Sequence, residues 1–451
     1  MASSPSGRVH FATRLVLLVA VLVLALATGC SPGGDGDDKT AALAAEPDTS
    51  AVSGEPPPNQ PAIPPAPPEQ SKRTVPDAPS NADEVPVAKV TGKPIPGQYI
   101  VTLKADENPR SVAAIAGVSP KWVYENALNG FTAQLNRGQL TALQHNRAVE
   151  AIEPDQEVTG EAYSTQVIDS TGQPWGLDRI DQRSGLSKTY SWWTSGTYGS
   201  GFGVRAYVID SGIATAHSDF GGRATNVYDA FGGNGQDCHG HGTHVAGTLG
   251  GFSHGVAKSV LLRGVRVLGC DNKGSFGGII AGVEYVRLNA VKPAVANISI
   301  GAPYSAATNT AVYNLVLSGV FVAVAAGNGD ANGRPVDACS TSPASARGTV
   351  TVASANSYDT KASDSNYGSC VDLYAPGVSV KSDWLNGTTN TISGTSMASP
   401  HVAGVAALLK SDYGDQTSAT IASWILSVVT PNAIKSNPSG TPNRLLFMSG
   451  W

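Results

Sequence analysis

Short, uninterrupted apolar runs recur through the C-terminal part of the chain, and they constrain its fold more than any other feature. They lie at residues 204–210, 260–268, 294–300, 320–326 and 350–354. Helical stretches such as residues 277–290 separate them. A strand that is apolar at every position has to be covered on both faces, which is typical of parallel sheets with helices on both sides. The sequence therefore predicts an α/β fold, with functional side chains at the carboxyl ends of its strands.

The composition is that of a large globular protein. Of the 451 residues, 41% are hydrophobic and 14% are charged, which is enough to build a sizeable core. The formal net charge is -5, and Lys and Arg are scattered along the chain. This distribution argues against nucleic acid as a partner.

The first residues indicate export. Arg8 and Arg14 precede an apolar run at residues 15–27, which has the length of a signal-peptide core and is short for a membrane span. The run ends in Ala-Thr-Gly-Cys30, which resembles a bacterial lipoprotein signal. That resemblance implies a lipid on Cys30 that anchors the precursor at the cell envelope, and ordinary cleavage nearby is the alternative. Residues 31–93 are rich in Pro, Ala, Ser, Asp and Glu, and we interpret them as a disordered linker.

Residues 94–160 have the pattern of a small α+β domain. Strands are expected at 98–104, 129–135 and 149–158, and helices near 107–117 and at 137–147. Taken alone, this pattern fits any ferredoxin-like module.

Three segments carry residues suited to nucleophilic catalysis. Asp210 closes an apolar strand, His241 stands in HGHGTHVAGTLGG, and Ser396 begins an apolar helix in GTSMASPHVAG. An Asp before Gly is usually only a turn residue, and a Ser at a helix start is usually only a cap. His239 and His244 compete with His241 for the role of base. A metal site is disfavoured because the cluster lacks the Glu of the helical zinc-protease motif.

The segments VIDSGI, GHGTHVAG and GTSMASPHVAG, in this order, resemble the signature segments of the subtilase family. Chymotrypsin-like proteases have the order His, Asp, Ser, and α/β-hydrolases have Ser, Asp, His with a GxSxG elbow, whose last glycine is Ala398 here. Within the family the chain is most similar to the proteinase K branch and its aqualysin-like enzymes, through PWGLDRIDQR, FGGNGQDCHGHGTHVAG and GTPNRLLF. The resemblance implies a subtilisin-like fold over residues 165–451. It also implies that residues 94–160 are a propeptide that assists folding and inhibits the enzyme.

The resemblance further implies a secreted serine endopeptidase that acts on proteins and peptides through an acyl-enzyme. His241 would accept the proton of Ser396, Asp210 would hold the imidazolium, and Asn328 in VAVAAGNGDANG would donate to the oxyanion. No cofactor enters this chemistry. The precursor would cleave itself between Glu161 and Thr165, and the mature enzyme would be a monomer. Two rival hypotheses are an inactive subtilase fold that only binds proteins, which the complete triad disfavours, and a secreted esterase, which the chain order disfavours.

Binding sites are implied by the same resemblance. Two backbone edges would hold substrate as an added strand, with Gly274, Ser275 and Phe276 on one edge and Ser299, Ile300 and Gly301 on the other. A structural calcium site would use the carbonyls of Arg347 and Thr349 and the carboxylate of Asp372. A second calcium site would use Asp178, Asp181 and Gln182 with Ser187 and Thr189, and an exposed acidic helix start is the alternative.

Four cysteines lie in the C-terminal half, apart from Cys30. An even set can form two disulfides in an exported protein, and the spacing of a structural zinc site is absent. Sequence alone leaves three connectivities open. The resemblance to aqualysin-like enzymes implies the pairs Cys238–Cys270 and Cys339–Cys370.

Overall fold

The structure is a computed structural model that describes residues 84–160, 174–191 and 200–448. The predicted signal peptide, Cys30 and the predicted cleavage segment 161–165 lie outside the described residues. Within the described ranges, no helix is both long enough and apolar enough to cross a membrane.

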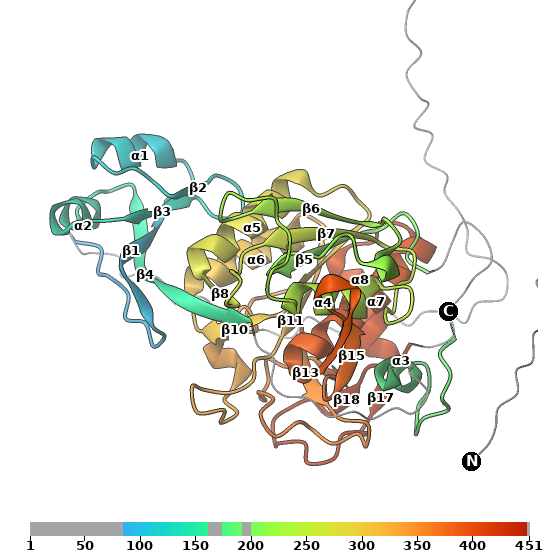
Figure 1. Cartoon of the computed structure of the whole chain (residues 1–451). Coiled ribbons are helices and arrows are strands. Elements are labelled where there is room, and N and C mark those ends of the chain that lie inside the picture. The colour runs from blue at the N-terminus through green and yellow to red at the C-terminus, as the bar shows by residue number, and fades with distance from the viewer. Residues whose placement is uncertain (1–83, 161–173, 192–199, 449–451) are drawn as a thin grey trace, which may run out of the picture. The chain divides into compact units, whose positions relative to one another are not determined.

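The N-terminal domain is the predicted α+β unit. Its elements are β1 (Pro94–Leu103), α1 (Pro109–Ile115), β2 (Trp122–Tyr124), β3 (Gly130–Gln134), α2 (Arg137–Gln144) and β4 (Val149–Gly160). The strands pair antiparallel in the order β4-β1-β3-β2, the arrangement of a ferredoxin-like module (Figure 1). Val101, Phe131 and Ile152 are among the residues of its own small hydrophobic core.

Residues 84–93 correct the predicted boundary of the linker. The amide of Val85 donates to the carbonyl of Gln144, and the amide of Ala88 donates to the carbonyl of Ile152. The side chains of Val85 and Val87 pack against the core of this domain. The Pro-rich composition concealed this Val-x-Val alternation, which gives an extended segment one apolar side. The last part of the predicted linker therefore belongs to the folded domain.

The C-terminal domain is built on a sheet of nine strands in the order β17-β18-β14-β13-β11-β9-β5-β7-β6. Every neighbouring pair is parallel except β17 and β18. All the predicted strands are present, as β5 (Arg205–Asp210), β7 (Leu261–Arg266), β9 (Ala294–Ile298), β11 (Phe321–Ala325) and β13 (Val350–Ala355). The strands not predicted are β6 (Ala224–Asp229), β14 (Leu373–Pro376), β17 (Thr430–Pro431) and β18 (Arg444–Leu445).

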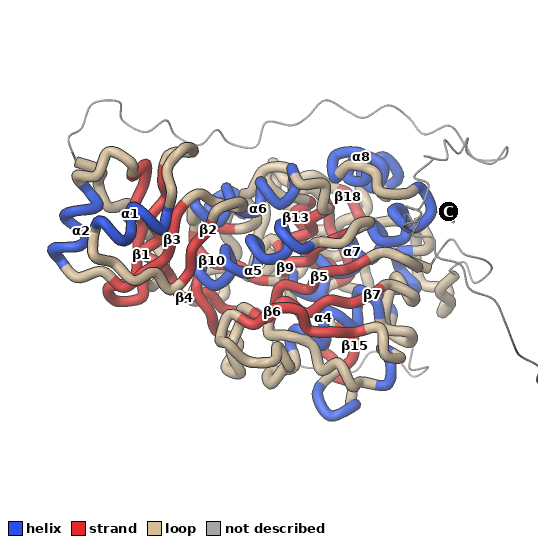
Figure 2. Tube along the Cα trace, turned by 90° about the horizontal axis from the view of Figure 1, so that it is seen from above, coloured by secondary structure: helices blue, strands red, loops and turns tan. Residues whose placement is uncertain are grey.

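Helices cover both faces of this sheet, as Figure 2 shows. One face packs against α4 (His241–Gly250), α7 (Thr395–Tyr413) and α8 (Ser418–Val428), and the other against α5 (Phe276–Asn289) and α6 (Ala306–Leu317). Consecutive residues of β5 show the alternation, because Val208 belongs to the first core and Ile209 to the second. The shorter elements are α3 (Trp175–Ile180), β8 (Lys273–Ser275), β10 (Ile300–Pro303), β12 (Thr341–Ser342), β15 (Val380–Asp383), β16 (Thr389–Ile392) and the 3-10 turns η1 (Ser218–Phe220), η2 (Ala338–Ser340) and η3 (Leu385–Gly387).

Both predicted disulfides are present. Cys238 is bonded to Cys270, and Cys339 is bonded to Cys370. The first bond lies just before α4, which begins with His241.

Candidate active site

Asp210 and His241 meet where the carboxyl end of β5 lies beside the start of α4. Asp210 is the last residue of β5, and His241 is the first residue of α4. The chain can turn into α4 because Gly240, which precedes it, has φ 109°, a left-handed conformation that favours glycine. Nδ1 of His241 lies 2.7 Å from Oδ1 of Asp210, and both side chains are fully buried. A buried carboxylate in this position fixes the orientation of the imidazole and stabilises its protonated form.

The two competing histidines, His239 and His244, lie in environments that do not suit a catalytic base. His244 is buried among core residues, its Nε2 lies 3.0 Å from the carbonyl of Val380, and burial lowers its pKa to about 3. It is therefore a neutral core residue. His239 is half-buried, and its pKa is lowered by burial and by the neighbouring His241. Of the three, His241 is the one whose ring contacts Asp210.

Ser396 stands in the first turn of α7 and is held by a pair of hydrogen bonds to Ser299. Proline at position 400, inside the helix, has no N–H to donate to the carbonyl four residues earlier, which is that of Ser396. That carbonyl instead accepts a hydrogen bond of 2.8 Å from Oγ of Ser299. In return, Oγ of Ser396 donates to the carbonyl of Ser299 at 3.1 Å. The helix irregularity caused by Pro400 thus ties the serine to the segment between β9 and β10.

Asn328 offers an unused hydrogen-bond donor beside Ser396. It follows β11 in a loop where Gly327 and Gly329 have positive φ angles of 99° and 92°. Its Oδ1 accepts from the amide of Thr395 at 2.8 Å. Its Nδ2 is buried and has no hydrogen-bond partner within the described part of the chain. A buried donor left free next to a nucleophile is the arrangement of an oxyanion hole.

The Asn328 loop depends on a residue that the sequence analysis missed. Nδ2 of Asn366 donates to the carbonyl of Ala326, and its Oδ1 accepts from the amides of Gly329 and Val336. Asn366 is fully buried. A single Asn in a polar segment gives no signal of this role, because its partners lie 30 to 40 residues away in the sequence.

The last strand of the N-terminal domain lies between the two predicted substrate-binding edges. β4 is antiparallel to both β8 and β10 (Figure 1). The paired residues are Glu157 with Ser275, Val158 with Gly274, Thr159 with both Lys273 and Gly301, and Gly160 with Ile300. The predicted edges therefore do accept an added strand, and in this structure the strand comes from the chain itself.

Phe276 and Ser299 differ from the other predicted edge residues. Phe276 is the first residue of α5 and is fully buried in the core beneath the sheet. Ser299 adjoins the β10 edge and contacts Ser396, as described above. Of the six residues predicted for substrate binding, Gly274, Ser275, Ile300 and Gly301 pair with β4.

Two acidic residues of β4 cap two helices of the C-terminal domain. Glu153 accepts a hydrogen bond of 2.5 Å from Oγ of Ser305, the N-cap of α6. Asp155 accepts from the amide of Gly277 in the first turn of α5 at 3.1 Å. Carboxylates are favoured at helix N-termini, where amide groups lack intrahelical partners. Burial raises the pKa of Glu153 to about 7 and also raises the pKa of Asp155.

In a third contact between the two domains, the carboxylate belongs to the C-terminal domain and the donors belong to the N-terminal domain. Glu284 in α5 accepts hydrogen bonds from the amides of Glu125 and Ala127 and from Nδ2 of Asn126. The sequence analysis missed Glu284, Glu153 and Asp155. The spacing of Glu153 and Asp155, which puts both on one side of a strand, was the available signal.

The residues predicted for the main calcium site lie on the segments that lead into β13 and β14. The amide of Thr351 donates to Oδ2 of Asp372 at 2.8 Å, and the amide of Asp372 donates to the carbonyl of Thr351. Arg347 and Thr349 lie on the segment that leads into β13. Asp372 and Thr349 thus precede the amino-terminal ends of two neighbouring parallel strands, and carboxylate and carbonyl oxygens are the ligands that calcium prefers.

The residues of the second predicted calcium site are also neighbours. Oδ1 of Asp178 accepts from Nε2 of Gln182 at 2.7 Å and from Oγ of Ser187 at 2.9 Å. Oγ of Ser187 lies 2.7 Å from Oγ1 of Thr189. Asp181 accepts from the amide of Ser191, and burial raises its pKa. Asp178 is buried, so the alternative of an exposed acidic helix start does not describe it.

Comparisons with known proteins agree with this geometry. A family model described as the subtilase family matches residues 201–451, and one described as peptidase inhibitor I9 matches residues 98–160. An extracellular serine proteinase from Thermus sp. (strain Rt41A) is 43% identical over 383 residues, which cover 78% of this chain and 90% of the relative. Proteinase R from Parengyodontium album is 38% identical over 374 residues, which cover 81% and 92%.

A solved structure shows the same fold. A cold adapted subtilisin-like serine proteinase matches with a TM-score of 0.57 and 47% identity, over 61% of this chain and 98% of the solved one. The sequence motifs, the parallel sheet and the two matched models all lead to one conclusion. The chain belongs to the subtilase family of serine proteases and carries an I9-type inhibitor domain in front of its peptidase domain.

Proposed function

We propose that this chain is the precursor of a secreted serine endopeptidase whose triad is Asp210, His241 and Ser396. One observation carries the proposal. β4, the last strand of the inhibitor domain, is antiparallel to both β8 and β10, the position of a peptide substrate. A chain that binds its own backbone in this way is suited to extended peptides rather than to small esters.

The geometry supports a simple sequence of steps. Oγ of Ser396 attacks the peptide carbonyl while Nε2 of His241 accepts its proton, and Asp210 stabilises the imidazolium through Nδ1. Nδ2 of Asn328, together with the amide of Ser396, donates to the oxyanion. His241 then gives the proton to the leaving amine, and water hydrolyses the acyl-enzyme by the same steps in reverse. These steps need no cofactor.

The test is hydrolysis of a fluorogenic peptide by the wild-type protein and by Ser396→Ala. Activity in the wild type alone supports the proposal. Equal activity in both proteins would contradict the role of Ser396. Faster hydrolysis of simple esters, with no cleavage of a denatured protein, would favour the esterase alternative.

The remaining features of the precursor belong to the same proposal. Residues 1–30 are an export signal with lipid on Cys30, residues 94–160 with the segment 84–93 form the propeptide, and the peptidase domain begins near residue 165. The mature enzyme acts as a monomer. The extracellular proteinase from Thermus supports export, and mass spectrometry of the precursor tests the lipid on Cys30.

Calcium would be bound by the carboxylate of Asp372 with the carbonyls of Arg347 and Thr349. A second ion would be bound by Asp178, Asp181 and Gln182. Calcium supplies no chemistry to the catalytic steps, because its role at both places is to hold loops of the folded chain together. The stabilisation follows from binding to the folded state alone.

A further inference from the structure

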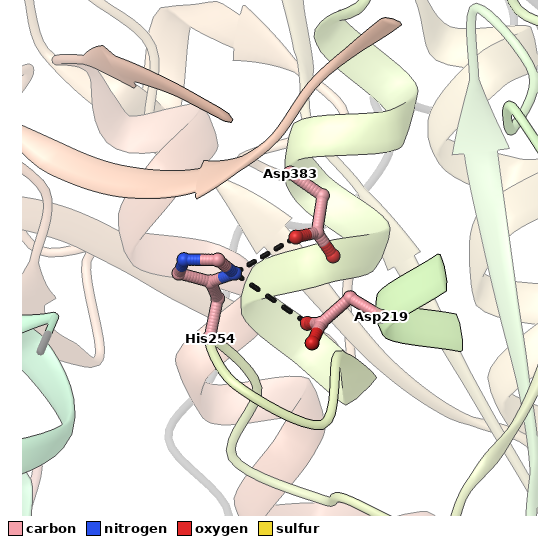
Figure 3. A group of neighbouring side chains, drawn as sticks. All are labelled: Asp219, His254 and Asp383. Atoms are coloured by element: carbon pink, nitrogen blue, oxygen red, sulfur yellow. Dashed lines mark hydrogen bonds and ion pairs between the residues drawn. The ribbon is translucent and has the colours of Figure 1, made fainter. Parts of the chain in front are cut away.

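A cluster of titratable side chains lies outside the catalytic triad (Figure 3). Asp219 comes from η1, His254 from the loop after α4, and Asp383 from the end of β15. Nδ1 of His254 lies 2.8 Å from Oδ1 of Asp383 and 3.4 Å from Oδ2 of Asp219. The three residues each offer one ligand atom, and these atoms lie within 4.8 Å of one another.

One carboxylate oxygen of this cluster has no hydrogen-bond partner among the described residues. Oδ2 of Asp383 is buried and has no hydrogen-bond partner in the described part of the chain, and the whole side chain is 0% exposed. A Cβ placed on Gly251 would lie 2.9 Å from this oxygen and in still closer contact with Oδ2 of Asp219. The two carboxylates therefore face the same point, and their repulsion has to be offset by a positive charge, either a proton on His254 or a bound cation.

Within the described residues, no positively charged side chain donates a hydrogen bond to Oδ2 of Asp383. The guanidinium of Arg223 is nearby but donates to the main-chain carbonyls of Gly250, Val260 and Asp219. A proton on Nδ1 of His254 can be shared between Oδ1 of Asp383 and Oδ2 of Asp219. It leaves Oδ2 of Asp383 unpaired. An ion with several open coordination positions can contact all of these atoms at once.

A second imidazole, that of His217, borders the cluster. Nε2 of His217 lies 3.0 Å from the carbonyl of Thr388, so the ring hydrogen belongs on Nε2. Its Nδ1 accepts from the amide of Asp219 at 3.2 Å and lies 3.8 Å from Oδ1 of Asp383. The one in-plane lone pair of Nδ1 is therefore used by that amide, so His217 keeps its place beside the cluster without being a ligand.

We propose that Asp219, His254 and Asp383 bind one divalent transition-metal ion, with Zn²⁺ the best match, and that water completes the coordination. Imidazole nitrogen with carboxylate oxygen is a donor set that suits zinc. Ligands about 2.0 Å from a tetrahedral zinc are separated by roughly 3.3 Å, so only small shifts from the observed spacings are needed. The side chains of His254 and Asp219 are each 9% exposed, which leaves a path for the ion.

The site would connect three segments that support the active site. α4 begins with His241 and ends just before the loop of His254, η1 follows the strand of Asp210, and β15 precedes Trp384, whose ring packs edge-on against His239 and His244. Zinc would therefore stabilise the far end of the helix that carries the catalytic histidine. Its role is structural.

The experiment uses the full-length Ser396→Ala precursor, which cannot digest itself, with calcium in excess so that oxygen-rich sites are filled. Zn²⁺ is titrated by calorimetry, and Co²⁺ is used as a probe because its visible absorption reports four-coordinate geometry. We expect one equivalent of Zn²⁺ to bind and to raise the unfolding temperature. In the same Ser396→Ala precursor, a second substitution, Asp383→Asn or His254→Gln, should weaken Zn²⁺ binding at least about tenfold and abolish the visible Co²⁺ spectrum.

The matched control is His239→Asn, because His239 is a half-buried imidazole outside the proposed site that Zn²⁺ could also contact. This variant should keep full binding. Asp383→Asn preserves the size of the side chain and an acceptor for His254, and circular dichroism checks that it folds. Binding no tighter than millimolar, or binding unchanged in Asp383→Asn and His254→Gln, would overturn the proposal.

Discussion

The free amide of Asn328 gives a prediction about single residues. Replacing Asn328 with Ala should lower kcat roughly 10²–10³-fold, which is about 3–4 kcal/mol of transition-state stabilisation, with little change in KM. The reason is that Nδ2 has no ground-state partner to lose. Steady-state kinetics with a chromogenic peptide measure both constants.

The control for this prediction is Asn332→Ala, which removes an exposed Asn from the same loop. It should leave both constants near those of the wild type. A rise in KM alone in Asn328→Ala, or an equal loss in both variants, would argue against an oxyanion role.

Residues of the site differ in how far the sequence reveals them. Ser396 and Asn328 stand in motifs whose glycines and helix start indicate a special backbone, so pattern and resemblance identify them. The sequence could not distinguish His241 from His244 by chemistry alone, because the carbonyl that faces His244 comes from β15. Glu284 and Asp383 were not predicted at all, since their roles depend on surfaces that meet only in the folded chain.

At the scale of elements, the contact of β4 with the helices that it caps predicts that propeptide docking depends on pH. Docked Glu153 has a pKa raised to about 7 by burial, against 4.5 for the ordinary side chain. The docked form thus binds the proton more tightly than the released form. Docking is strongest below about pH 4.5, weakens by up to about 3 kcal/mol as the pH rises to about 7, and is constant above that. Propeptide release should therefore accelerate across this window.

The measurement is the dissociation rate of the processed complex as a function of pH, followed by tryptophan fluorescence. Trp122 is a suitable reporter because its ring lies beside Gly277 of α5. Glu153→Gln should flatten the pH dependence, whereas Glu150→Gln, at an exposed position of the same strand, should not. The same slope in Glu153→Gln and wild type would exclude Glu153 as the titrating group.

Elements were predictable in proportion to their burial. Strands covered on both faces, such as β5 and β11, are continuous apolar runs and were found from the sequence. β6 was missed because it is the last strand of the sheet and most of its residues are only half-buried. Residues 84–93 were misassigned because composition describes a whole segment and hides a short apolar alternation within it.

At the scale of the whole molecule, we predict that Ser396→Ala accumulates as the unprocessed precursor. The wild type should be cut between Glu161 and Thr165, because the strand that ends at Gly160 is already paired with β8 and β10, the two edges predicted to bind substrate. N-terminal sequencing of protein made in a protease-deficient host identifies the bond. Normal processing of Ser396→Ala in that host would rule out self-cleavage, and adding mature wild-type enzyme tests cleavage between molecules.

A second prediction at this scale concerns calcium. Calcium should lengthen the half-life of thermal inactivation, and Asp372→Asn should reduce that protection without lowering kcat, because the site lies away from the triad. Asp364→Asn, a half-buried residue of the same region, is the control and should keep the protection. Equal half-lives with calcium and with chelator would contradict the proposed calcium site.

Strand β4 joins the two domains in one sheet, since it pairs with β1 of the propeptide and also with β8 and β10, the edges that we propose bind substrate. Cutting the chain after β4 therefore does not by itself produce a working enzyme. The cut propeptide keeps its own fold for as long as its core, built around residues such as Val101 and Phe131, stays intact. The delay between processing and activity then depends on how fast this domain dissociates or unfolds, and variants that stabilise its docked, folded form would postpone the onset of proteolysis without altering the catalytic residues.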